Sequence, residues 1–176
     1  MKRFVRTTTT LLGALLLGLP LAGLASHDRV FVPLFGYEEV PAVSTQAIGF
    51  FRATINRQAG TIEYELVYDA LAGEVRQSHI HFGQKGVNGG VSVFLCQTAT
   101  NVDPTGLAPT CAAPPARITG VLTSANIIGP GGQGIAATEI NELIAAIRAG
   151  IAYVNVHSAT FAGGEIRGQF DRHGFH

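Results

Sequence analysis

The sequence predicts an all-β protein, an antiparallel β-sandwich with Greek-key connections and one crossover helix. Several short segments alternate apolar and polar residues, and a period of two is typical of half-buried strands. Glycine and proline are frequent, at 22 and 8 of 176 residues, which suits a chain with many turns. Only one segment has helical periodicity. Together these observations favour two packed layers of strands.

Eight segments are predicted to be strands. The predicted strands are Arg29–Phe35, Ala47–Asn56, Thr61–Leu71, Glu74–Phe82, Val91–Cys96, Arg117–Thr123, Ala152–His157 and Gly164–Phe170. Pro33 has no N–H to donate, so we expect the first strand at a sheet edge. The helix is predicted over Thr138–Ala149, with Thr138 as its N-cap and Gly150 closing its C-terminus.

The first 25 residues have the pattern of a cleaved secretory signal. Three basic residues are followed by an uncharged apolar run, Leu11–Ala25, which ends in small residues. That run is too short to span a bilayer comfortably, so we expect no membrane anchor. We predict cleavage before Ser26, leaving residues 26–176 as a single domain.

The charge of the predicted mature chain is weakly acidic. It holds nine Lys and Arg against twelve Asp and Glu, and Lys85 is its only lysine. Such a surface is a poor partner for nucleic acid. Gly129–Gly134 (GPGGQG) matches the spacing of a dinucleotide fingerprint, but its predicted surroundings are strands rather than a βαβ unit. We therefore interpret it as a loop.

Cys96 and Cys111 are the only cysteines. Export would take them to an oxidising compartment, where a disulfide is the expected state. The alternative is a free thiol or a thiolate metal ligand. We predict the disulfide, and a secreted or periplasmic location.

Two histidines share one face of a predicted strand in Gln77–Gly83 (QSHIHFG). Ile80 and Phe82 face the core, so His79 and His81 both lie on the opposite face, roughly 6.6 Å apart. Two imidazoles at this spacing can lean toward one ion or one hydrogen-bonding partner.

The two C-terminal strands repeat this alternation. Val154 and Val156 alternate with polar residues that include His157. In the last strand Glu165 and Arg167 share the polar face. We expect these polar faces to meet that of the histidine pair.

Five motifs in order, GYEEVP, SHIHFG, GGVSVFLC, AGIAYVNVHS and GGEIRGQF, resemble the CHRD domain, named from chordin and present in exported microbial proteins. The resemblance runs from about Val30 to Phe170 and implies an immunoglobulin-like β-sandwich. Its last motif contains Glu165, Ile166, Arg167 and Gly168. The chordin form has a cysteine where this chain has Gly168, so the sequence resembles the microbial branch.

CHRD domains are also distantly similar to copper–zinc superoxide dismutases. The similarity matches His79 and His81 to a strand-borne pair of copper ligands, and His157 to the last copper ligand. Between His81 and His157 the chain has no histidine. The zinc half-site and one copper ligand are therefore missing, and we do not expect dismutase activity.

Two functions remain open at this stage. We predict an exported, non-enzymatic binding or structural module whose partner is a protein or a carbohydrate, with the histidines as neutral strand clamps. The alternative is a periplasmic protein that binds copper or zinc through His79, His81 and His157. Glu165 could be a fourth ligand, although an ion pair with Arg167 is the simpler expectation. No motif of a hydrolase is present.

Overall fold

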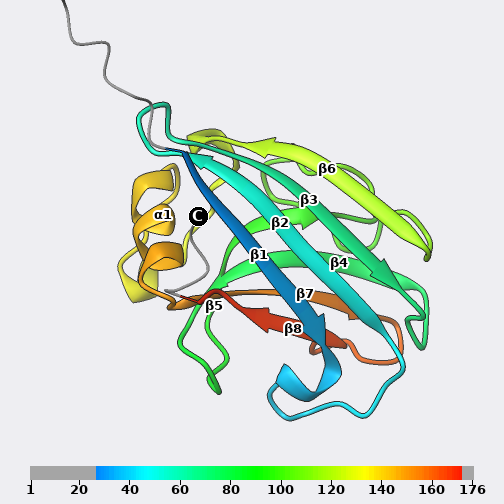
Figure 1. Cartoon of the computed structure of the whole chain (residues 1–176). Helices are drawn as coiled ribbons and strands as arrows, with labels where there is room; N and C mark the ends of the chain where they lie inside the picture. The colour runs from blue at the N-terminus through cyan, green and yellow to red at the C-terminus, as the bar shows by residue number, and fades with distance from the viewer. Residues whose placement is uncertain (1–26, 172–176) are drawn as a thin grey trace, which may run out of the picture.

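The computed structural model describes residues 27–171, and these form eight antiparallel strands and one α-helix, as predicted (Figure 1). The strands are β1 His27–Phe35, β2 Ile48–Asn56, β3 Thr61–Asp69, β4 Val75–Phe82, β5 Gly90–Cys96, β6 Ala116–Leu122, β7 Ala152–Ser158 and β8 Ile166–Gln169. The helix α1 is Ile140–Arg148, and three 3-10 turns are η1 Gly36–Glu38, η2 Ser124–Asn126 and η3 Gly131–Gln133. The predicted leader, Met1–Ala25, and the predicted cleavage point lie outside the described residues.

The strands form one sheet that folds over on itself, in the order β5-β4-β7-β8-β1-β2-β3-β6. β8 and β1 pair only at Phe35 and Arg167, so this junction divides the sheet into two layers of four strands. The chain makes the meander β1-β2-β3, crosses to the other layer for β4 and β5, and returns for β6 beside β3 (Figure 1). α1 then carries it back to β7, which completes the Greek-key arrangement.

The core lies between the two layers. The fully buried side chains come from alternate positions of both layers, as the period of two predicts. They include Leu34, Phe51, Ile62, Leu66, Ile80, Leu95, Val154, Val156, Ile166 and Phe170. The buried Tyr64 hydroxyl of β3 donates to the Leu95 carbonyl of β5 at 2.6 Å, which connects the two layers across the core.

Cys96 and Cys111 are bonded to each other, which confirms the disulfide prediction. The bond joins the end of β5 to the irregular segment before β6. That segment is also ordered by Asp103, whose carboxylate accepts hydrogen bonds from the backbone N–H groups of Thr105, Leu107 and Ala108. The long loop is therefore held by the disulfide and, in its middle, by Asp103.

Two local predictions were wrong in detail. Thr138 does not cap the helix: its φ is 71°, in the left-handed region, and Glu139 occupies the N-cap position without a side-chain capping bond. The predicted edge strand β1 lies inside the sheet order. Pro33 is accommodated because β1 pairs with β8 only at Phe35, two residues further on.

Gly168 allows β8 to approach β1 closely. A Cβ at this position would collide with the Pro33 carbonyl oxygen and with side chains of Val32 and Leu34. Any larger residue here would have to push β1 away from β8. Among residues 27–171, no helix is long and apolar enough to cross a bilayer.

Candidate metal centre

Three buried histidines converge on the outer face of the β4-β7-β8 layer. One ring nitrogen from each of His79, His81 and His157 lies within 4.8 Å of the other two. The side chains come together because β4 pairs with β7, with His79 opposite Asn155 and His81 opposite Tyr153. The polar faces of the two strands therefore meet, as the alternation predicted.

Backbone carbonyls fix the protons of two of these rings. His81 Nδ1 donates to the Gly89 carbonyl oxygen at 2.9 Å, and His157 Nδ1 donates to that of Ala162 at 2.9 Å. A neutral imidazole carries one N–H, so the Nε2 atoms of both rings are unprotonated and carry a lone pair. His81 Nε2 is buried and has no hydrogen-bond partner. Both rings are thus oriented as metal ligands commonly are.

The surroundings of His157 Nε2 are those of a cation site. It lies 3.2 Å from His79 Nδ1 and 3.1 Å from Asn155 Oδ1. Since the ring's proton is on Nδ1, the lone pairs of Nε2 and of the amide oxygen meet with no proton between them. Two ligands of a tetrahedral ion bound at 2.0–2.1 Å are about 3.3 Å apart, which matches both contacts.

Burial keeps the three imidazoles neutral. Burial, and then the charges of His157 and His81, lower the pKa of His79 to about 2. Burial also lowers the pKa of His81 to about 4, against the effect of the Gly89 carbonyl, and it lowers the pKa of His157. Neutral imidazole is the form that binds a metal ion, so the site needs no proton loss from its histidines.

Glu39 is a buried carboxyl group beside this cluster that sequence reasoning missed. Its side chain is 5% exposed, and its Oε1 has no hydrogen-bond partner. The Asn155 amide hydrogen-bonds to it, and burial raises the pKa of Glu39 to about 7, although Arg167 opposes the shift. A glutamate in the loop segment GYEEVP gives no sequence signal of burial.

Arg167 holds the loop over the site, residues 83–89. Its Nη2 donates to the Val87 carbonyl at 2.9 Å, and its Nη1 donates to Asn88 Oδ1 at 3.3 Å. The same guanidinium lies over the ring of Tyr153, with Cζ 3.3 Å from the ring centroid. The loop contains Gly89, so Arg167 indirectly fixes the hydrogen bond that orients His81.

Glu165 has a different place from the one expected. Its Oε1 accepts hydrogen bonds from Thr45 Oγ1 at 2.7 Å and from the Ala72 N–H at 2.8 Å. It is not in the group of converging metal-ligand residues, and among the described residues it forms no ion pair with Arg167. The expected Glu165–Arg167 ion pair was therefore wrong, because the carboxylate is occupied by the loops that precede β2 and β4.

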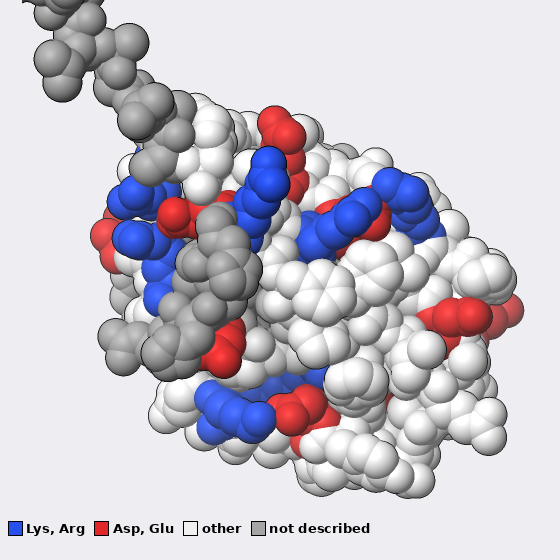
Figure 2. Space-filling view, in the orientation of Figure 1, with Lys and Arg blue, Asp and Glu red and all other residues white. Residues whose placement is uncertain are grey.

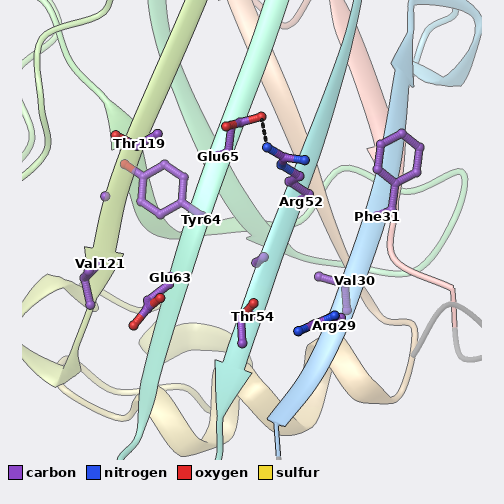
Figure 3. Close-up of a pocket in the computed structure, with 12 residues that line it drawn as sticks. Arg29, Val30, Phe31, Arg52, Thr54, Glu63, Tyr64, Glu65, Thr119 and Val121 are labelled. Carbon is purple, nitrogen blue, oxygen red and sulfur yellow. Dashed lines mark ion pairs between the residues drawn. The ribbon is translucent and has the colours of Figure 1, made fainter. Parts of the chain in front are cut away.

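A second candidate surface lies on the other layer. A hollow of about 910 Å³ follows the outer face of β1, β2, β3 and β6, where Phe31 stands beside the Arg52–Glu65 ion pair (Figure 3). Phe31 is 60% exposed, and its ring lies 5.5 Å from that of Phe50. Figure 2 shows this side as a wide uncharged area with scattered charges of both signs around it. The surface suits contact with a partner, but it has no metal-ligating histidine.

Comparison with curated proteins found no match, and comparison with solved structures found none either. The similarity to copper–zinc superoxide dismutase therefore stays a prediction. A family model, that of the CHRD domain, matches residues 30–170, which include the converging histidines and Arg167. That match spans most of the sequence, and the chain belongs to the CHRD domain family.

Proposed function

We propose that this CHRD domain is an exported binding module whose ligand is a transition-metal ion, copper or zinc, held by His79, His81 and His157. CHRD membership supports a binding or structural module. The observation that carries the metal proposal is the contact of two acceptor atoms, His157 Nε2 and Asn155 Oδ1, at 3.1 Å, with His79 Nδ1 only 3.2 Å from the same nitrogen.

The alternative is that the histidines only clamp neighbouring strands. A clamp satisfies its hydrogen bonds, because a buried polar atom without a partner costs about 1–3 kcal/mol. Here His79 Nε2 and His81 Nε2 are both buried without a partner. A metal ion would use the free lone pair of His81, so metal binding accounts for the arrangement better than clamping does.

The donor atoms favour copper or zinc over other ions. Imidazole nitrogen suits both metals, whereas calcium and magnesium prefer oxygen ligands. The site offers no thiolate, because both cysteines of the chain are in the disulfide. When bound, the ion would hold β4 and β7 together at the outer face of their layer.

Export is part of the proposal. The disulfide and the sequence of residues 1–25 both support a secreted or periplasmic location. Mass measurement of the protein recovered outside the cytoplasm should show the loss of Met1–Ala25. A full-length species retained in the membrane would contradict this part.

Metal binding is tested by titration calorimetry on chelator-treated protein. Wild type should bind one equivalent of Zn(II) or Cu(II), and His157→Ala should lose tight binding. His27→Ala is the matched control, because His27 is exposed at the start of β1, and it should bind as wild type does. Equal affinity in wild type and His157→Ala would overturn the proposal.

A further inference from the structure

The contact between His157 Nε2 and Asn155 Oδ1, two acceptor atoms 3.1 Å apart, also points to a fourth ligand. We propose that Asn155 Oδ1 completes the ligand set, and that Glu39 holds the amide in this orientation and makes the site selective for divalent over monovalent ions. This inference rests on the proposed metal function.

The orientation of Asn155 follows from its two neighbours. An amide has one donor end and one acceptor end. Its oxygen faces His157 Nε2 at 3.1 Å, which leaves the N–H end of the amide to interact with Glu39. The amide also lies close enough to His81 to raise the pKa of that histidine against the effect of burial. The oxygen therefore points to the place where the free imidazole nitrogens converge.

A fourth protein ligand would close the site. Structural zinc sites have four protein ligands, whereas catalytic sites keep one position open for water. The three histidines are 2%, 8% and 6% exposed, so little space is left for a water ligand. A closed site agrees with a binding module in which the ion is held and not used for turnover.

Glu39 supplies the negative charge that a dication needs in the interior. Three imidazoles and an amide are neutral ligands, so the ion would keep its full charge beside the Arg167 guanidinium. Charge buried without a partner is strongly disfavoured. The Asn155 amide, its hydrogen bond to Glu39 and its 3.1 Å contact with His157 Nε2 separate the carboxylate from that nitrogen by roughly 8 Å.

The charged groups around Glu39 leave it as the nearest available anion. Arg167 is opposite it from β8, and Glu38 is more exposed and is paired with Lys85 at 3.0 Å. Glu165 is occupied by Thr45 and Ala72. Gly164 has room for Glu39 only because it lacks a Cβ, which would collide with the carboxylate. The fold thus holds this carboxyl group against the site.

The test measures Zn(II) and Ag(I) affinity at pH 8 in wild type, Glu39→Gln and Glu65→Gln. Coulomb attraction at this distance predicts that Glu39→Gln weakens Zn(II) binding by about tenfold or more, and Ag(I) binding by only about the square root of that factor. Glu65→Gln removes an equally buried carboxylate from the other layer and should change neither affinity. Equal losses for the two ions, or no loss, would overturn the role of Glu39.

The ligand role of Asn155 has its own measurement. In Co(II)-substituted wild type, azide should leave the visible spectrum unchanged, because no coordination position is open. In Asn155→Ala, azide should bind and change the spectrum. A spectral change in wild type would contradict a closed site. If wild type binds none of these metals, the proposed function itself fails; if it binds Zn(II) and the variants match it, only this inference fails.

Discussion

The imidazole of His81 lies parallel to the ring of Tyr153, with 4.7 Å between the ring centroids and 3° between the planes. Tyr153 also contacts the guanidinium of Arg167 and accepts a hydrogen bond from the Gly89 N–H at 3.2 Å. A residue of the family motif is thereby connected to a candidate ligand through one aromatic ring. The orientation of His81 depends on both the loop and this stack.

Arg167→Lys should cost about 2–4 kcal/mol of unfolding free energy. The side chain is 1% exposed, and an ammonium can reproduce neither the flat contact with Tyr153 nor the forked hydrogen bonds to Val87 and Asn88. Urea denaturation of metal-free protein measures the loss. Arg117→Lys, at an exposed ion pair with Glu65, should cost less than about 1 kcal/mol. A similar loss in both variants would contradict the account.

Gly168→Ala should destabilise the junction of the two layers. The added Cβ would meet the Pro33 backbone, which cannot move aside as a flexible side chain could. We expect a loss of about 1–3 kcal/mol, typical of overpacking. Gly163→Ala is the control, because no atom lies within 4 Å of its added Cβ. Thermal unfolding of the two variants should separate them, and coincident curves would show that the close approach has no energetic weight.

Removing the disulfide should lower stability without changing the fold. The bond closes a 15-residue separation, for which the loop-entropy estimate is about 3 kcal/mol. The Cys96→Ser/Cys111→Ser double variant should keep the circular dichroism spectrum of the wild type and unfold at a lower urea concentration. Loss of the β spectrum in native buffer would show that the bond is required for folding.

Acid should destabilise the metal-free protein between pH 6.5 and 4.5. The folded-state pKa values of His79 and His81 lie near 2 and 4, below the ordinary 6.5. As the pH falls, the unfolded chain therefore binds these protons before the folded chain does, and the unfolding free energy decreases. His157 adds to the loss, since its pKa is also lowered. Glu39 acts in the opposite direction, because its raised pKa of about 7 lets the folded state bind a proton that the unfolded state binds only near 4.5.

The net effect should be about 1–3 kcal/mol per pH unit in this window, because two or three histidines outweigh one carboxyl group. Urea denaturation at pH 7, 6 and 5 in the presence of a chelator measures it. A constant unfolding free energy from pH 7 to 5 would mean that the histidines are accessible to protons in the folded state.

Local pattern explains which parts of the fold could be predicted. The alternation around Ile80 and Val154 placed two strands and the faces of His79, His81 and His157 correctly. The disulfide followed from the cysteine count and the predicted export. These features depend on residues close in sequence or on a single possible pairing.

Features that depend on distant segments could not be predicted. Glu39 is buried only because the loop after η1 folds against Gly164 and Asn155. The expected Glu165–Arg167 ion pair assumed that neighbours on one strand face interact, whereas Thr45 and Ala72 from other loops satisfy Glu165. The same limit applies to Pro33. Its strand lies inside the sheet order and not at an edge, and this is possible because β1 and β8 pair at a single position, Phe35 with Arg167.

The central claim is that His79, His81 and His157 together hold one metal ion. Calorimetric titration of Zn(II) into chelator-treated wild type and into the His79→Ala/His81→Ala double variant tests it most directly. The account predicts one tight site in the wild type and no tight site in the double variant, with the His27→Ala control unchanged. Equal affinity in wild type and the double variant would contradict the claim and leave the three histidines as strand clamps.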